Sequence, residues 1–311
     1  MNIAFLFPGQ GSQFVGMAAD LAEAFPLAAD TLAEADEFLG REVALGRLMR
    51  EGPAEALTAT EVAQPAILTH SVAVLRLLHE AGVAPAMVAG QSLGEYSAVL
   101  AAGALEFPEA VRLVRARGLV MAEAGAQAGG TMSAILGLDD AVAEQVAAEA
   151  EQVGTVVVAN YNSPGQVVIS GETAAVRRAE ELAKAAGARG AMPLKVSGAF
   201  HSPLMARAGE RLRLLLEQTP LEDALVPLVS NVDATPRQAA AEIRAALARQ
   251  ITGSVRWTES VRRMVEAGAE VFVEVGPGEV LTRLMKRIAP EAEAISTSTV
   301  AGVEKALERL A

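Results

Sequence analysis

Residues 83–104 read VAPAMVAGQSLGEYSAVLAAGA and contain the strongest structural signal in the chain. The small apolar residues at 86–89 predict a short buried strand, and residues 95–102 predict a helix. Between them lies Gly90-Gln91-Ser92-Leu93-Gly94, a G-x-S-x-G motif in the strand–turn–helix context that it requires. We expect the two glycines to permit a sharp turn that places the Ser92 hydroxyl at the top of a sheet.

The motif is compatible with two interpretations. The structural one is a glycine-rich strand–helix turn without chemistry, because a bare G-x-S-x-G also arises by chance. The functional one makes Ser92 a nucleophile, since the helix N-terminus behind it favours developing negative charge. The flanking strand and helix favour the functional interpretation.

The composition is that of a globular α/β protein. The chain has 311 residues, 51% of them hydrophobic, and can therefore bury a large core. The absence of cysteine excludes disulfides, a thiol nucleophile and a thiolate metal site. The formal net charge of -12 argues against nucleic acid and anionic membranes as partners. No apolar run is long enough to span a membrane, and the first ten residues lack the basic segment of a signal peptide, so we expect a cytoplasmic protein.

Strands alternate with helices along most of the chain. Apolar runs predict buried strands at 3–7, 227–230 and 270–275. Helices are predicted over 66–81, 108–124 and 236–250. This alternation predicts a mostly parallel sheet covered on both faces, in an α/β-hydrolase-like core. The glycine-rich loop at 8–13 follows the first strand, but it matches neither a P-loop nor a dinucleotide fingerprint.

A second unit is predicted within this core. The segment 125–130, GAQAGG, is expected to be a flexible junction. After it the pattern runs strand, helix, strand, strand, helix, strand, which is the order of a ferredoxin-like fold. We therefore predict an inserted ferredoxin-like (βαββαβ) subdomain over 129–195 and a discontinuous catalytic domain made of 1–128 and 196–311.

A serine nucleophile needs a base, and the chain offers three histidines. His201 lies in a glycine-containing loop before a helix and C-terminal to Ser92, so we predict that it accepts the serine proton. His70 and His79 have no motif beside them and are interpreted as packed or surface residues. No acidic residue between Ser92 and His201 is convincingly placed as a third triad member. A backbone carbonyl or a side-chain amide is an alternative orienting group.

Arg117 falls in the middle of the apolar arc of the helix at 108–124. A buried guanidinium needs an anion or hydrogen-bond acceptors as partners. One interpretation is a structural ion pair with an internal carboxylate. The other is a clamp for a substrate carboxylate, which a guanidinium can bind through two parallel hydrogen bonds. Together with Ser92 and His201, the clamp predicts transfer, through an acyl-serine, of an acyl group that carries a carboxylate.

Ordered motifs along essentially the whole chain resemble one known family. They are FPGQGSQ at 7–13, QPAI at 64–67, GQSLGEYSA at 90–98, R-x-R-G at 115–118, GGTMSAI at 129–135, NYNSPGQ and VISG within 160–171, AFHSPLM at 199–205, SNVDA at 230–234 and EVGPG at 274–278. The chain is similar to the malonyl-CoA:acyl carrier protein transacylases of fatty acid synthesis and to the acyltransferase domains of polyketide synthases.

The resemblance implies roles for individual positions. Ser92 matches the nucleophile, His201 the general base and Arg117 the residue that pairs with the malonyl carboxylate. The remaining matches are Gln10 and Leu93 for the backbone oxyanion hole, Gln250 for a backbone carbonyl that orients His201, Gln64 and Asn160 for the lining of the active-site cleft, and Met132 and Phe200 for acyl-group size. Ala199-Phe200-His201 resembles the signature of malonyl-selective members.

The implied reaction has two half-reactions without a metal or a cofactor. Malonyl-CoA acylates the serine, and the phosphopantetheine thiol of acyl carrier protein then accepts the malonyl group. We expect a monomer whose partners are malonyl-CoA and acyl carrier protein. Docking of an acidic carrier protein would need a local basic patch, which the sequence does not locate. Residues 285–287 with Arg283 are one candidate, but a solvated helix face is the favoured interpretation of these residues. Three alternatives stay open, namely a serine hydrolase, transfer of acetyl or methylmalonyl, and a noncatalytic carrier-protein binder. Arg117 argues against acetyl, and Phe200 argues against a branched acyl group.

Overall fold

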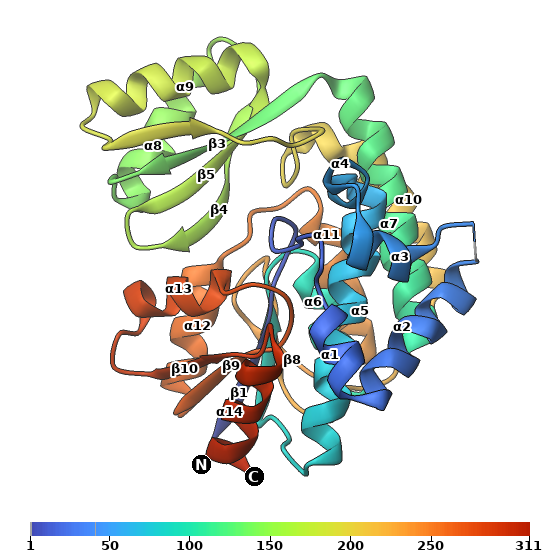
Figure 1. Ribbon diagram of the computed structural model, residues 1–311. Coiled ribbons are helices and arrows are strands. Elements are labelled where there is room, and N and C mark those ends of the chain that lie inside the picture. Colours follow the sequence, from blue (N-terminus) through green and yellow to red (C-terminus); the bar gives the residue numbers. More distant parts are fainter. Residues whose placement is uncertain (1, 41) are drawn as a thin grey trace.

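The computed structural model describes residues 2–40 and 42–311, and its larger unit is built on a six-stranded sheet (Figure 1). In sheet order the strands are β10 (Glu293–Ser296), β9 (Val271–Glu274), β1 (Ile3–Phe7), β2 (Met87–Gly90), β7 (Leu228–Val229) and β8 (Pro236–Arg237). All neighbouring strands are parallel except β8, which pairs antiparallel with β7. The predicted mixed α/β fold with a parallel-dominated sheet is confirmed.

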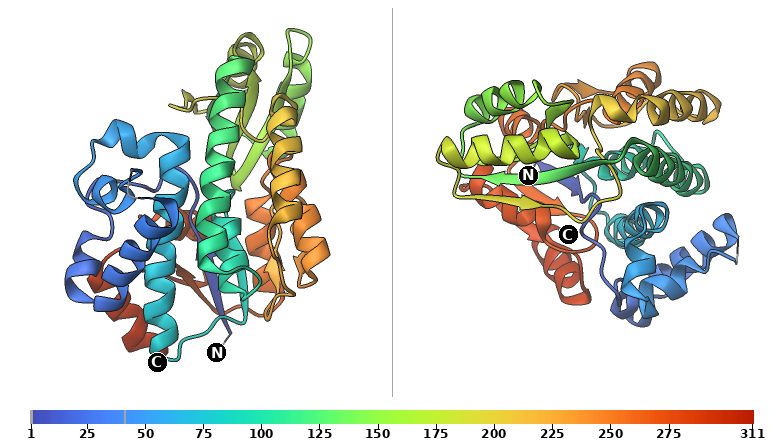
Figure 2. Two further views of the ribbon diagram at one scale, coloured as in Figure 1. Left: turned by 90° about the vertical axis from the view of Figure 1, so that its right-hand side faces the viewer. Right: turned by 90° about the horizontal axis from the view of Figure 1, so that it is seen from above.

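Helices cover both faces of this sheet. Successive side chains of a strand point to opposite faces, and because the side chains on both faces are apolar, each face needs a covering layer. Phe5 and Phe7 of β1 belong to one core, and Ala4 and Leu6 belong to the core on the other face. The helices are α1 (Ala19–Ala24), α2 (Pro26–Leu39), α3 (Leu45–Glu51), α4 (Ala54–Thr58), α5 (Thr60–Glu80), α6 (Gly94–Ala101), α7 (Phe107–Ala128), α10 (Ala206–Gln218), α11 (Ala240–Gln250), α12 (Trp257–Glu266), α13 (Val280–Ile288) and α14 (Val300–Leu310), with a 3-10 turn at Pro203–Met205. Figure 2 shows α5 and α7 side by side.

The smaller unit follows α7 and has its own sheet and core. Its elements are β3 (Gly130–Leu136), α8 (Asp140–Ala150), β4 (Val156–Ser163), β5 (Gln166–Glu172), α9 (Thr173–Ala185) and β6 (Gly190–Pro193). The strands are antiparallel in the order β4-β5-β3-β6, and a separate hydrophobic core packs α8 and α9 against them. The two units meet where Tyr161 N–H donates to the Val255 carbonyl at 2.9 Å.

The predicted flexible junction at 125–130 is wrong, because α7 continues to Ala128. Its Gly125 serves close packing instead of flexibility. A Cβ at this position would lie 2.3 Å from the carbonyl oxygen of Ser197. The glycine therefore lets the segment before His201 pass directly over the helix.

Two predicted helix boundaries also differ from the structure. The helix expected over 66–81 begins at Thr60 and carries Pro65 inside it. Proline lacks the N–H that would bond to the carbonyl of Glu61, and Arg115 donates to that carbonyl at 2.7 Å instead. The helix expected from Pro236 begins at Ala240, because Pro236 lies in strand β8.

The glycines of the G-x-S-x-G motif are needed for close approach between β2, α6 and the loop after β1. A Cβ on Gly94 would lie 2.0 Å from the carbonyl oxygen of Phe7, and one on Gly90 would lie 1.9 Å from the backbone of Gly94. It is Ser92 itself that adopts the left-handed conformation, with φ 52°. Within the described ranges, no helix combines the length and the apolar character needed to cross a membrane.

We expect Gly94→Ala to destabilise the fold by about 3 kcal/mol, because neither its Cβ nor the Phe7 backbone can move away without shifting a strand. Urea unfolding measures this change in the free energy of unfolding. Gly190→Ala is the control, since its Cβ would have its nearest contact 3.7 Å away. The control should stay within about 0.5 kcal/mol of the parent protein. A Gly94→Ala variant of parental stability would contradict the close approach.

Candidate active site

The Ser92 hydroxyl and the His201 imidazole are in direct contact above the sheet. Ser92 Oγ lies 2.7 Å from His201 Nε2, and His201 Nδ1 lies 2.9 Å from the main-chain oxygen of Gln250. A carbonyl can only accept, so Nδ1 carries the proton and Nε2 is free to accept the serine proton. The group that contacts Nδ1 is thus a backbone carbonyl, one of the alternatives that the sequence left open.

The turn that presents Ser92 is held from two sides. Ser92 N–H donates to Asn231 Oδ1 at 2.7 Å, and Gln250 Nε2 donates to the Ser92 carbonyl at 2.7 Å. Asn231 also donates to the carbonyl of Gly90 at 2.6 Å. These contacts help to impose the left-handed φ angle of Ser92, 52°, which non-glycine residues adopt only when their surroundings require it. His201 is also left-handed, with φ 56°.

Arg117 lies beside the nucleophile and has no carboxylate partner. Its guanidinium donates to Gln64 Oε1 at 2.7 Å, to Gln250 Oε1 at 3.0 Å and to Ser92 Oγ at 3.2 Å. Tyr96 packs its ring 5.2 Å from the guanidinium carbon. In the described part of the chain, no Asp or Glu lies within ion-pair distance of Arg117. The geometry therefore lacks the internal ion pair that was one interpretation of this residue.

The charge state of Arg117 gives the site its electrostatic character. The side chain is 1% exposed, and burial lowers the pKa of its guanidinium. An arginine nevertheless keeps its proton at neutral pH, because its reference pKa is above ~12. The site therefore holds a buried positive charge whose direct hydrogen-bond partners are all neutral, and it favours a substrate that brings an anion.

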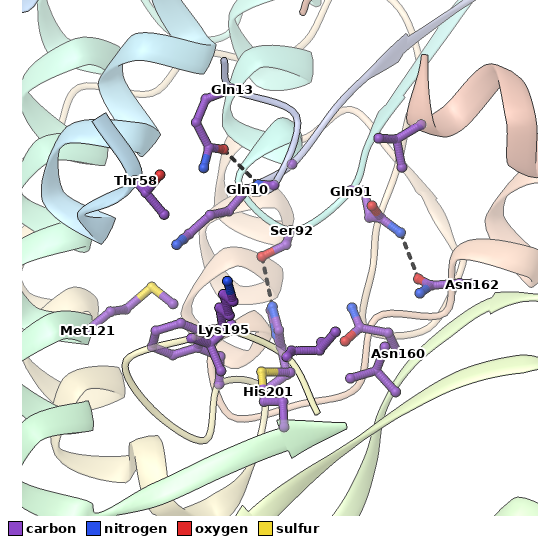
Figure 3. Close-up of a pocket in the computed structure, with 18 residues that line it drawn as sticks. Gln10, Gln13, Thr58, Gln91, Ser92, Met121, Asn160, Asn162, Lys195 and His201 are labelled. Carbon is purple, nitrogen blue, oxygen red and sulfur yellow. Dashed lines mark hydrogen bonds between the residues drawn. The ribbon is translucent and has the colours of Figure 1, made fainter. Parts of the chain in front are cut away.

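A cavity of about 400 Å³ opens at Ser92, between the two units (Figure 3). Of the residues predicted for the site, the cavity wall contains Gln10, Ser92, Met132, Asn160, Phe200 and His201. The others predicted, Gln64, Leu93, Arg117 and Gln250, are buried behind this wall.

Several residues of this site were missed by sequence reasoning. Gln91 Nε2 donates to Asn162 Oδ1 at 2.8 Å across the cavity, and Lys195 is a charged side chain on its wall. Asn162 lies in the motif NYNSPGQ and Asn231 in the motif SNVDA, and membership of these motifs was the only sign in the sequence that they belong to the site. Only the tertiary structure assigns their contacts, which join Asn162 to Gln91 across the two units and Asn231 to Ser92 within the larger unit.

Two backbone N–H groups near Ser92 are free to stabilise an oxyanion. Among the described residues, neither Gln10 N–H nor Leu93 N–H donates a hydrogen bond within the protein. The two loops that carry them touch, since a Cβ on Gly9 would lie 2.5 Å from the Gln91 carbonyl oxygen. Leu93 is buried and Gln10 lies on the cavity wall, so a tetrahedral oxyanion formed at Ser92 would give both N–H groups an acceptor.

The pKa of His201 is lowered to about 4, first by burial and then by the positive charge of Arg117, against the effect of the Gln250 carbonyl. The neutral, proton-accepting form therefore exists throughout the physiological range. We expect kcat/KM for acylation by acetyl-CoA, a donor without a carboxylate for Arg117 to bind, to stay level as pH falls from 8 and to decline only near pH 4, instead of at the ordinary histidine value of ~6.5.

A pH–rate profile of acylation by acetyl-CoA tests this expectation. Removing the positive charge in Arg117→Ala should move the acid limb upward, because that charge disfavours the imidazolium. An acid limb near pH ~6.5 in the parent protein would contradict the effect of burial.

The comparisons with known proteins agree with this geometry. Residues 4–309 match the family described as acyl transferase domain. The chain belongs to the acyl transferase family. Within this family it is 47% identical to the malonyl CoA-acyl carrier protein transacylase of Bacillus subtilis (strain 168), over 99% of this chain and 97% of the relative. It is also 47% identical to the protein of the same name from Escherichia coli (strain K12), over 99% of both chains.

A solved acyl transferase structure extends the likeness to three dimensions. A type II polyketide synthase acyl carrier protein was solved in complex with its malonyl transacylase. The matching chain superposes with a TM-score of 0.96 at 45% identity and covers 99% of this chain and 100% of its own. An acyltransferase reaction uses a nucleophile, a base and a place for an oxyanion, and the arrangement around Ser92 offers candidates for all three.

Proposed function

We propose that this acyl transferase moves the malonyl group of malonyl-CoA to the phosphopantetheine thiol of acyl carrier protein, through a malonyl-serine at Ser92. The observation that carries the proposal is the Arg117 guanidinium, which has no carboxylate partner among residues 2–40 and 42–311 and lies 3.2 Å from Ser92 Oγ. A malonyl group on Ser92 would bring the missing carboxylate. The names of the two bacterial relatives support the same reaction.

In the first half-reaction, Ser92 Oγ attacks the thioester carbonyl while His201 Nε2 accepts the hydroxyl proton. The N–H groups of Gln10 and Leu93 donate to the oxyanion of the tetrahedral intermediate. The intermediate collapses with loss of coenzyme A, whose thiolate takes the proton from His201. The Gln250 carbonyl stabilises the transient imidazolium through Nδ1–H.

In the second half-reaction, the carrier-protein thiol gives its proton to His201 and attacks the malonyl-serine carbonyl. The same N–H groups hold the second oxyanion, and Ser92 leaves with the proton that His201 returns. The two substrates use one cavity in turn, so the kinetics are ping-pong. These steps need neither a metal nor a redox cofactor. The product, malonyl acyl carrier protein, is the extender unit for fatty acid synthesis.

The remaining predicted residues shape the acyl end of the cavity. Gln64 holds Arg117 from behind, and Asn160 lies on the wall contributed by β4. Met132 and Phe200, both 5% exposed, fill the space beside Ser92. We infer that these two side chains limit the room for a branch at the α-carbon and so favour malonyl over methylmalonyl.

The proposed architecture assigns these roles to two subdomains. The strand order β4-β5-β3-β6 with two helices supports a ferredoxin-like subdomain over 129–195. The parallel sheet and the strand–turn–helix at Ser92 support an α/β-hydrolase-like catalytic domain over 1–128 and 196–311.

Transfer is distinguished from hydrolysis by supplying the protein with malonyl-CoA, with and without the pantetheinylated carrier protein. We expect malonyl acyl carrier protein to form much faster than free malonate, and intact mass to show malonylation of the enzyme when the carrier is omitted. Rapid release of malonate without any acceptor would instead identify a hydrolase and overturn the proposal.

A further inference from the structure

A buried carboxylate that the proposed chemistry does not use lies beneath the nucleophile turn. Glu95 is fully buried on the first turn of α6. Its Oε1 accepts from Ser230 Oγ at 2.9 Å and from Asn231 N–H at 3.2 Å, and its Oε2 accepts from Gln250 Nε2 at 2.6 Å. Burial raises the pKa of Glu95 to about 7, while these three hydrogen bonds favour its ionised form.

The direction of each hydrogen bond in this cluster follows from the chemistry of its neighbours. The Gln250 amide lies between the Ser92 carbonyl, which only accepts, and the Arg117 guanidinium, which only donates. Its NH2 group must therefore face Ser92 and Glu95, and its oxygen must face Arg117. The Asn231 N–H can only donate. Both oxygens of Glu95 are consequently required as acceptors.

The result is one polarised chain from the carboxylate to the guanidinium. Glu95 accepts from the Gln250 amide, whose oxygen accepts from Arg117, and Arg117 in turn donates to Ser92 Oγ. Hydrogen bonds in such a chain strengthen one another in a medium of low dielectric constant. The same Gln250 provides the main-chain oxygen that contacts His201. One carboxylate thus contacts the residue that links all three groups of the site.

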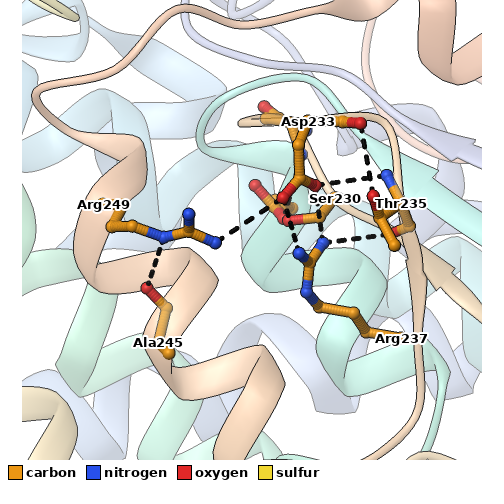
Figure 4. A network of polar contacts seen from close by, with 8 residues as sticks. Ser230, Asp233, Thr235, Arg237, Ala245 and Arg249 are labelled. Atoms are coloured by element: carbon orange, nitrogen blue, oxygen red, sulfur yellow. Dashed lines mark hydrogen bonds and ion pairs between the residues drawn. The ribbon is translucent and has the colours of Figure 1, made fainter.

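The far side of the cluster is anchored by the β7–β8 hairpin (Figure 4). Asp233 accepts from both terminal nitrogens of Arg237, at 2.7 and 2.6 Å, and lies 3.6 Å from Arg249 of α11. Ser230 N–H donates to the Thr235 carbonyl at 3.1 Å across the same hairpin. The contacts within the hairpin fix the segment that carries Ser230 and Asn231, the two donors to Glu95 Oε1, and the Arg249–Asp233 pair joins it to the last turn of α11.

We propose that Glu95 is a positioning residue, which orients the Gln250 amide so that the Arg117 guanidinium is held beside Ser92 to receive the substrate carboxylate. This inference rests on the proposed malonyl transfer and adds a selectivity role for a residue that touches neither substrate. Glu95→Gln is the sharpest test, because it keeps the size of the side chain and replaces one acceptor by a donor.

In that variant the new NH2 group must face either Asn231 N–H or the Gln250 amide. The second conflict is relieved only by turning the Gln250 amide over, which would point its NH2 at Arg117 and its oxygen at the Ser92 carbonyl. Both new contacts are repulsive, so Arg117 loses an acceptor and its fixed position.

The experiment measures kcat/KM with malonyl-CoA and with acetyl-CoA as donors at pH 8, where Glu95 of the parent protein is ionised. We expect Glu95→Gln to lower the malonyl-to-acetyl ratio by about tenfold, since a hydrogen bond to a charged group is lost. In the Arg117→Ala background the same change should cause no further loss of the ratio, because the two residues act in one chain.

Two further variants are measured beside Glu95→Gln, one as a control and one as an independent way to break the chain. Ser230→Ala removes a neutral donor from Glu95 but leaves the Gln250–Arg117 chain intact, and it should preserve the ratio. Gln250→Met keeps the main-chain carbonyl and removes the amide, so it should reproduce the loss even if Glu95→Gln fails to fold. Thermal unfolding of each variant reports its fold.

A parental ratio in folded Glu95→Gln or in Gln250→Met would overturn the positioning role. Equal losses with both donors, accompanied by a lower Tm, would also overturn it, because they indicate a purely structural carboxylate. Failure of the parent protein to form malonyl acyl carrier protein would instead refute the proposed function itself, whatever the variants do.

Discussion

Ser92→Ala is expected to abolish acyl-enzyme formation and to lower transfer by a factor on the order of 10⁴ to 10⁶, the range seen when a serine nucleophile is removed. The hydroxyl is the atom that bonds to the acyl group, and no cysteine is available to replace it. Intact mass after mixing with malonyl-CoA should show one malonyl adduct on the parent protein and none on the variant.

The variant should remain folded, because Ser92 is held through its backbone N–H and carbonyl, which alanine keeps. His201→Ala is the matched comparison, since it removes the base and leaves the hydroxyl. We expect it to acylate slowly, not to be inert. A malonyl adduct of undiminished yield on Ser92→Ala would refute Ser92 as the nucleophile.

Arg117→Ala should lower kcat/KM for malonyl-CoA by about 10² to 10³, whereas kcat/KM for acetyl-CoA should fall little or rise. Truncating one partner of a buried charge pair costs about 3–5 kcal/mol, and the malonyl carboxylate is the partner that would be left unpaired. Acetyl-CoA has no carboxylate to pair with the Arg117 guanidinium, so removing the guanidinium costs no interaction with this donor. Steady-state kinetics with both donors measure the two effects.

Arg112→Ala is the control for this prediction, because Arg112 is an exposed arginine on the same helix that lies over the ring of Phe38, away from the cavity. It should leave both kcat/KM values within about twofold. Equal losses with malonyl-CoA and acetyl-CoA in Arg117→Ala would contradict the carboxylate clamp and leave a structural role for the arginine.

Local patterns predicted a large part of this molecule. The parallel-dominated sheet and the strand–turn–helix at Ser92 follow from short apolar runs and from two glycines, which act over a few residues. The order of elements in 130–193 was also readable from the alternation of strands and helices. The predicted helix boundaries were wrong where a residue far away in the sequence changed what the local pattern would favour. Pro65 is tolerated inside α5 because Arg115 bonds to the freed carbonyl, and Gly125 lies within α7 because a glycine there allows Ser197 to pass close over the helix.

For Arg117 too, the sequence predicted one property, its burial, but not its partners. Its place in an apolar arc predicted burial, and the choice between an internal ion pair and a substrate clamp stayed open. The structure places amide and hydroxyl oxygens around Arg117, with no carboxylate in the described chain at ion-pair distance. Which acceptors surround a helix face depends on the neighbouring helices, and periodicity along one helix carries no such information.

What the sequence by itself determined is the nucleophile turn, the alternation of elements and the presence of a buried cation, because each depends on sterics or periodicity within one segment. The tertiary structure alone decided that a carbonyl contacts His201, and that Glu95 and Arg117 are joined through the amide of Gln250. Gln250 is separated from Glu95 by 155 positions and from Arg117 by 133. Contacts over such distances in the chain exist only once the sheet has set the order of its strands, since that order places the end of α11 beneath the turn at Ser92.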